Sequence, residues 1–179
     1  MRHHGRPHYS TALRQSIQRV PPRAHRTRGT GVAFALAVGT KTNTPELSRD
    51  LDRALPLLAR DAVATAMAAG ALPGLEGHAM ATRLGAIAAD EICDLERVAA
   101  RIASLGGSPT LSTKRLEMPK KWRGAVEWLL EMQRESTDAL VAAIPADADD
   151  AEGEASEHLL EHIVARKRDV IEVLERALR

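Results

Sequence analysis

The stretch "ADEICDLERVAARIASLGGSPTL", residues 89–111, is the part of the sequence that decides the fold. Its apolar residues recur every three or four positions, as on one face of an α-helix, and Gly106-Gly107 is typical of a helix end. Glu91 nevertheless lies where this pattern expects a core residue, and Asp94 follows one turn later. A carboxylate in an apolar seam needs a partner. A partner for Glu91 must therefore be sought elsewhere in the chain.

The composition favours one all-α domain. Apolar residues make up 44% of the 179 residues and aromatic residues only 2%, so the core must consist of Leu, Ile, Val, Ala and Met. No alternating run predicts a strand, and no apolar stretch is long enough to cross a bilayer. The single cysteine, Cys93, cannot form an internal disulfide, which is typical of a reducing compartment. We therefore expect a cytoplasmic protein without a membrane segment.

Residues 1–43 differ from the rest of the chain. They contain eight Lys and Arg residues and no acidic residue, so they carry +8, which leaves −7 for residues 44–179. The segment lacks periodicity and is predicted to be a disordered basic extension. It could bind nucleic acid through phosphate groups, or it could be a targeting signal ending in "VAFALAV", residues 32–38. Alternatively, translation begins at Val32 or Val38, and residues 1–37 do not belong to the native protein.

From residue 44 onward, capping residues and helix breakers predict four helices. Thr44 is the expected N-cap of the first helix, which extends to Gly70. The others are expected at residues 76–105, at 121–144 and, after the acidic "ADADDAEGE", at 155–179. About fourteen residues, "SPTLSTKRLEMPKK", separate the second helix from the third. Two short turns and one long crossover predict an antiparallel four-helix bundle over residues 44–179.

Each predicted helix has an apolar stripe that one strongly polar residue interrupts near mid-length. The four interruptions are, in chain order, Asp61, Glu91, Gln133 and Lys167. Four polar side chains at matching height predict a buried polar cluster in the core. We expect the ammonium of Lys167 to pair with Asp61 and Glu91 and to hydrogen-bond with Gln133.

Three of the helices resemble those of the ferritin-like family, which includes the bacterioferritins and the Dps and Dps-like proteins. "DEICDLERVAARIASLGGSPTL" is similar to the family's Asp-Glu-x-x-His stretch with its Leu-Gly-Gly-x-Pro end. "ALPLLARDAVATA" resembles the Leu-x-x-Glu-x-x-Ala segment of the first helix, and "EHLLEHIVARKRDVIEVLERAL" resembles the last helix. The resemblance covers residues 45–179 and implies a ferritin-like bundle.

The resemblance also implies a di-iron site, with carboxylates from two helices and a Glu-x-x-His motif from each of the other two. Transferred to this sequence, the remaining metal ligands are Asp61, Glu91 and Asp94, the last in place of histidine. The glutamate of the third helix falls on Gln133, or on Glu131 or Glu135 if the register shifts, and Lys167 and Val170 replace the final Glu-x-x-His pair. The site implied by the resemblance is therefore incomplete. The family's haem-binding members have a methionine after the bridging glutamate; because Ile92 lies there, we expect no haem.

Two functions follow from this reading. The resemblance implies iron binding, iron storage or ferroxidase activity with an incomplete site. The residue chemistry instead favours a non-catalytic structural or interaction subunit in which Lys167 replaces the metals. The resemblance further implies a homo-oligomer, either a dimer or a small shell, or a mixed assembly with active ferritin-like subunits.

Overall fold

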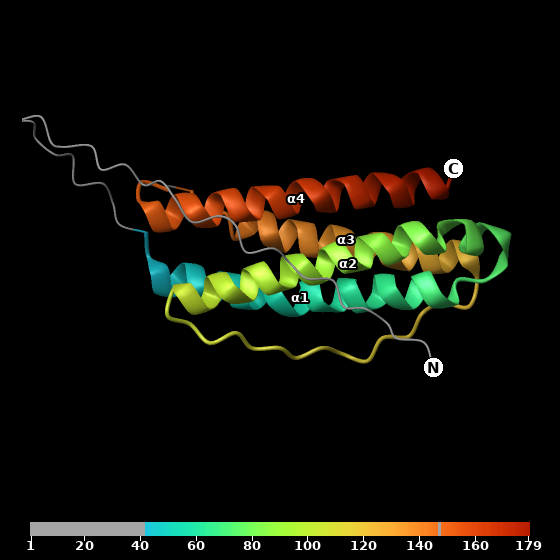
Figure 1. Ribbon diagram of the computed structural model, residues 1–179, viewed down its shortest axis with the longest axis horizontal. Helices are drawn as coiled ribbons and strands as arrows, with labels where there is room; N and C mark the ends of the chain where they lie inside the picture. The colour runs from blue at the N-terminus through green and yellow to red at the C-terminus, as the bar shows by residue number, and fades with distance from the viewer. Residues whose placement is uncertain (1–41, 147) are drawn as a thin grey trace, which may run out of the picture. The chain divides into compact units, whose positions relative to one another are not determined.

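The computed structural model describes residues 42–146 and 148–179. Within these ranges every regular element is a helix, which confirms the all-α prediction (Figure 1). The predicted basic extension lies outside the described residues, apart from Thr42 and Asn43. No helix in the described ranges is both long enough and apolar enough to span a membrane. The helices are α1 (Thr44–Ala71), α2 (Gly74–Ser104), α3 (Trp122–Ala142) and α4 (Ala151–Ala177).

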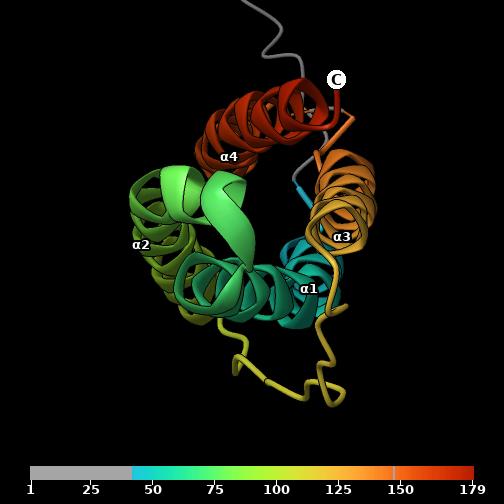
Figure 2. The ribbon, with the colours of Figure 1, turned by 90° about the vertical axis from the view of Figure 1, so that its right-hand side faces the viewer.

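The helices form an antiparallel bundle with one long crossover, as predicted. Viewed from its end, the bundle has α1 beside α2 and α3, and α4 beside α3 and α2 (Figure 2). Residues 105–121 run along the length of the bundle between the end of α2 and the start of α3 (Figure 1). Because of this crossover, α2 and α3 run in the same direction at opposite corners, whereas neighbouring helices are antiparallel.

The end of α2 confirms the predicted Gly-Gly stop. Gly106 has a φ of 82°, a left-handed conformation that favours glycine. The Gly106 amide donates to the carbonyl of Ala103 and the Gly107 amide to that of Ile102, which is the Schellman pattern. These two bonds satisfy carbonyl groups that the helix itself leaves unpaired.

All four helix starts differ from the prediction, by one to four residues. The cap of α1 is Asn43, one residue before Thr44. The start of α4 lies at Ala151 instead of near residue 155, because the Asp150 side chain accepts a 2.8 Å hydrogen bond from the Gly153 amide. The acidic "ADADDAEGE" segment therefore contains an N-cap and a first turn, where negative charge stabilises a helix.

Two aspartates attach non-helical segments to the bundle. Asp150 also accepts from the amide and the hydroxyl of Thr42, at 2.9 and 2.7 Å. Asp52 on α1 accepts from the amide and the hydroxyl of Thr110, at 2.7 and 2.6 Å, and so holds the crossover against α1.

The apolar core consists of two clusters. One gathers around Leu51, Leu58, Ile102 and Leu160, and the other around Leu84, Leu129 and Leu174. The residues that interrupt the four stripes are also buried, with Asp61 and Gln133 completely inaccessible to solvent. Along each helix these residues lie between members of the first cluster and members of the second. A polar layer therefore divides the apolar core.

Two glycines, one after the end of α2 and one inside it, allow a matched test of the Schellman stop. Gly106→Ala should lower the free energy of unfolding by about 1–2 kcal/mol, because a Cβ strains the left-handed conformation. Gly85→Ala, in the exposed middle of the same helix, has open space for its Cβ and should raise it by about 0.5–1 kcal/mol. Urea unfolding of both variants measures the difference. Equal effects would contradict the assignment of Gly106 to the helix stop.

A pH titration tests the attachment of the crossover. Hydrogen bonds from the side chain and the amide of Thr110 lower the pKa of Asp52. This contribution to stability is therefore present above the ordinary aspartate pKa and is lost as the pH falls through the lowered value. The amide resonance of Thr110 should titrate with a midpoint below that of an ordinary aspartate, and in Asp52→Asn this transition should disappear. A midpoint at or above the ordinary value would contradict the attachment.

Candidate functional site

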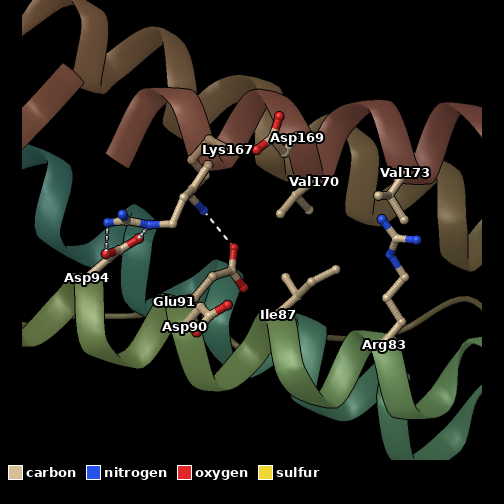
Figure 3. Close-up of a pocket in the computed structure, with 10 residues that line it drawn as sticks. Arg83, Ile87, Asp90, Glu91, Asp94, Lys167, Asp169, Val170 and Val173 are labelled. Atoms are coloured by element: carbon tan, nitrogen blue, oxygen red, sulfur yellow. Dashed lines mark hydrogen bonds and ion pairs between the residues drawn. The ribbon is translucent and has the colours of Figure 1, made fainter. Parts of the chain in front are cut away.

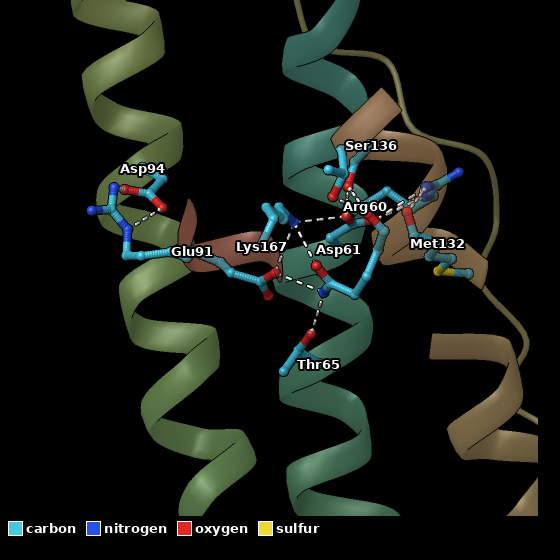
Figure 4. A network of polar contacts seen from close by, with 11 residues as sticks. Arg60, Asp61, Thr65, Glu91, Asp94, Met132, Ser136 and Lys167 are labelled. Carbon is cyan, nitrogen blue, oxygen red and sulfur yellow. Dashed lines mark hydrogen bonds and ion pairs between the residues drawn. The ribbon is translucent and has the colours of Figure 1, made fainter. Parts of the chain in front are cut away.

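The polar layer is centred on the side chain of Lys167 from α4, which is only 2% exposed. Its Nζ donates to Asp61 Oδ2 at 2.7 Å, to Glu91 Oε1 at 2.8 Å and to Gln133 Oε1 at 2.8 Å (Figure 4). An ammonium group has three N–H donors, and here each donates to a different helix. The structure thus brings together the four residues that interrupt the apolar stripes.

Asp61 has further partners on α1 and α3. Its Oδ1 accepts from Nε and Nη2 of Arg60, at 3.2 and 3.1 Å, and its Oδ2 accepts from the hydroxyl of Ser136. Arg60 also donates to the Met132 carbonyl and pairs with Glu135 (Figure 4). Burial raises the pKa of Asp61, although Lys167, Ser136 and Arg60 all favour its ionised form. The charge of Asp61 is therefore compensated on both of its oxygens.

Gln133 links Glu91 to the ammonium. Its Nε2 donates to Glu91 Oε1 at 2.7 Å, while its Oε1 accepts from Lys167. A longer contact, 3.4 Å, joins Nε2 to the Thr65 hydroxyl on α1. Glu91 Oε1 thus accepts two hydrogen bonds. Glu91 Oε2 is buried and has no hydrogen-bond partner among the described residues.

Asp94 lies outside the Lys167 cluster, although it is on the same helix as Glu91. It is buried, and its Oδ2 accepts from Arg166 Nε at 2.9 Å; Oδ1 accepts from the second Arg166 nitrogen and from Arg97 (Figure 4). The family resemblance implies that Asp94 is a metal ligand together with Asp61 and Glu91. In the structure, Arg166 neutralises Asp94 separately.

Four contributing residues were not predicted from the sequence: Arg60, Thr65 and Ser136, which complete the cluster, and Arg166, which neutralises Asp94. Two of these directly precede stripe residues, Arg60 before Asp61 and Arg166 before Lys167. A usable signal did exist for Arg166. Asp94 shares a helix face with Glu91 and needs its own cation, and the residue beside Lys167 is placed to supply one.

The residues of this layer do not fit a pair of metal ions. A protonated lysine has no lone pair to offer a metal, and its Nζ occupies the point toward which Asp61 and Glu91 converge. Within the described ranges, no group of three or more His, Cys, Asp or Glu side chains is placed to hold a metal ion. The inward carboxylates are instead compensated by cations of the protein itself.

Comparison with solved structures identifies the fold as ferritin-like. A ferritin-like diiron-carboxylate protein from Bacillus anthracis strain Ames has a TM-score of 0.70 and 19% sequence identity, covering 78% of this chain and 100% of that one. A Dps protein from Vibrio cholerae O1, a member of a broad superfamily of ferritin-like diiron-carboxylate proteins, has a TM-score of 0.69 and 16% identity, covering 84% and 100%. No protein-family model and no curated protein matches the sequence.

Loss of the central ammonium should destabilise the protein strongly. Lys167→Met removes the cation while leaving Asp61 and Glu91 buried, so we expect the free energy of unfolding to fall by about 3–5 kcal/mol. Denaturant unfolding measures this change. The adjacent Arg168 is exposed, and Arg168→Met should alter stability by less than about 0.5 kcal/mol.

A combined variant separates the charge effect from a packing effect. If uncompensated carboxylates cause the loss, adding Asp61→Asn and Glu91→Gln to Lys167→Met should recover part of it. A fall of under 1 kcal/mol for Lys167→Met alone would instead mean that the ammonium reaches solvent rather than the cluster.

Proposed function

Given a ferritin-like fold, we propose that this protein is a non-catalytic bundle, a structural or interaction subunit that works without a di-iron centre. The observation that supports the proposal is the central ammonium of Lys167, which bonds to one side chain from each of the other three helices. Lys167 takes the place of the metal ions and supplies the positive charge that the inward carboxylates require.

The chemistry of the layer supports a role without iron. Ferrous iron would have to displace Lys167 and would meet Gln133, a neutral ligand, where the resemblance implies a third carboxylate. Asp94, the remaining carboxylate of that set, is held by Arg166. Rearranging the layer would therefore leave a buried ammonium without its partners, which is costly.

Iron handling is the second candidate. It is supported by the description of both similar solved structures as ferritin-like diiron-carboxylate proteins. Under this alternative, Asp61, Glu91 and Asp94 would bind iron with an incomplete ligand set, and the side chain of Lys167 would move out of the layer.

An anaerobic titration of the full chain with ferrous iron, followed by exposure to oxygen, separates the two candidates. We expect no stoichiometric iron binding and no oxygen consumption above that of iron alone. Uptake of about two iron ions per chain with rapid oxidation, abolished by Glu91→Ala, would establish a ferroxidase and overturn the proposal.

A gain-of-function variant is the matched control. Asp94→His, Gln133→Glu, Lys167→Glu and Val170→His together restore the ligand set that the family resemblance implies. This variant should bind iron under the same conditions if it folds, which circular dichroism checks. Iron binding by this variant, with none by the wild type, would locate the defect in the replaced ligands.

The interaction role has its own measurement. A structural subunit would associate with copies of itself or with active ferritin-like subunits, and sedimentation velocity of the full chain gives its mass in solution. A dimer or a small shell would support self-association. A monomer at every concentration would exclude self-association. The proposal would then require a mixed assembly, which co-purification with a di-iron Dps protein would test.

A further inference from the structure

A cavity of about 160 Å³ lies between α2 and α4, beside the polar layer (Figure 3). These two helices pack less closely than α1 and α2, which leaves the space open. Buried residues at its inner end are Glu91, Lys167 and Val170, whereas exposed Arg83, Asp90 and Asp169 lie at its rim.

The carboxylate of Glu91 gives the cavity an unmet hydrogen-bonding requirement. The side chain is 5% exposed, and Oε1 accepts from both Lys167 and Gln133. Oε2 has no partner among the described residues, and Figure 3 shows the carboxylate directed into the space between the two helices. Leaving a buried acceptor unsatisfied is unfavourable, so this oxygen favours a ligand that donates a hydrogen bond.

Three of the side chains that line the cavity are aliphatic. Ile87 on α2 faces Val170 and Val173 on α4 (Figure 3). Against these three side chains a bound water finds no hydrogen-bond partner. An apolar cavity of roughly 150 Å³ has the capacity for a molecule the size of benzene, so there is room for a short hydrocarbon.

The charges around the cavity favour a cation. Four carboxylates line it against three basic side chains, a formal balance of −1. Arg166 is held by Asp94, and Lys167 by the polar layer. Asp90, Asp169 and Arg83, by contrast, have no hydrogen bond or ion pair with the described residues, so the unpaired charges at the rim sum to −1. An anion would meet Glu91 at the inner end, whereas a cation would be attracted both there and at the rim.

We propose that this cavity binds a small organic ammonium ion, a primary amine with a short aliphatic body. Its nitrogen donates to Glu91 Oε2, and its hydrocarbon lies against Ile87, Val170 and Val173. The ligand uses the oxygen that Lys167 leaves free, so the polar layer stays intact when it binds. The ligand occupies the space beside the layer rather than its centre, and the site rests on the proposed function in that Glu91 binds no metal.

Nuclear magnetic resonance of the full chain tests the site with three probes of equal length: n-butylammonium, 1-butanol and n-butyrate, at constant pH and ionic strength. We expect saturable shifts of the amides in residues 87–94 and 166–173 with n-butylammonium. Binding of 1-butanol should be at least about tenfold weaker, since a neutral donor lacks the charge attraction, and n-butyrate should give no saturable shift. Equal responses to the three probes, or no saturable response to the amine, would overturn the proposal.

A matched pair of variants locates the binding. Val173→Phe places a larger side chain in the cavity without touching the Lys167 contacts, and it should abolish the response to n-butylammonium. Val141→Phe makes the same change at an exposed position on α3, away from the cavity, and should leave the response unchanged. Thermal melting of both variants checks that they fold. Retained binding in a folded Val173→Phe variant would refute the assigned site.

Discussion

The contact on which the rest of the structure depends is the ammonium of Lys167 with its three acceptors. The Asp61 and Glu91 carboxylates lie in the interior of a small bundle, where an isolated charge is prohibitive. One cation with three hydrogen-bond donors compensates them and also binds Gln133. Because each acceptor comes from a different helix, all three hydrogen bonds form only when the four helices are correctly aligned along the axis of the bundle. We infer that the cluster specifies alignment as much as it contributes stability.

The composition of the two apolar clusters explains why the helices need a polar contact to fix their alignment. They are built almost entirely from Leu, Ile, Val and Ala, without a buried aromatic ring among the described residues. Aliphatic side chains of similar size tolerate rearrangement, so a core of this kind fixes the general shape more firmly than the register. A hydrogen-bonded ion cluster has few alternative arrangements. The polar layer and the aliphatic clusters therefore have complementary roles.

Much of this architecture could be predicted from sequence, because its signals are local or periodic. The three-to-four spacing gave the helices, Gly106 marked the end of α2, and four interrupted stripes identified Asp61, Glu91, Gln133 and Lys167 as one buried set. The failures have different causes. Arg60 flanks a stripe residue and looks like an ordinary surface cation, and only the packing of the helices reveals what it contacts. The start of α4 was placed too late because acidic residues were read as a linker, although Asp150 caps the helix.

The crossover separates the chain into two hairpins, α1–α2 and α3–α4, and the charges of the polar layer are divided unequally between them. Asp61 and Glu91 belong to the first hairpin, whereas Lys167 belongs to the second. Each hairpin thus carries buried charge that it does not neutralise alone, because in the first hairpin Arg60 offsets only one of the two carboxylates. Two first hairpins from separate molecules would bring four carboxylates together, and two second hairpins would bring two ammonium groups together. When several chains fold close to one another, this division of charge favours pairing of a first hairpin with a second hairpin. It disfavours pairing of two first hairpins, or of two second hairpins, from different molecules.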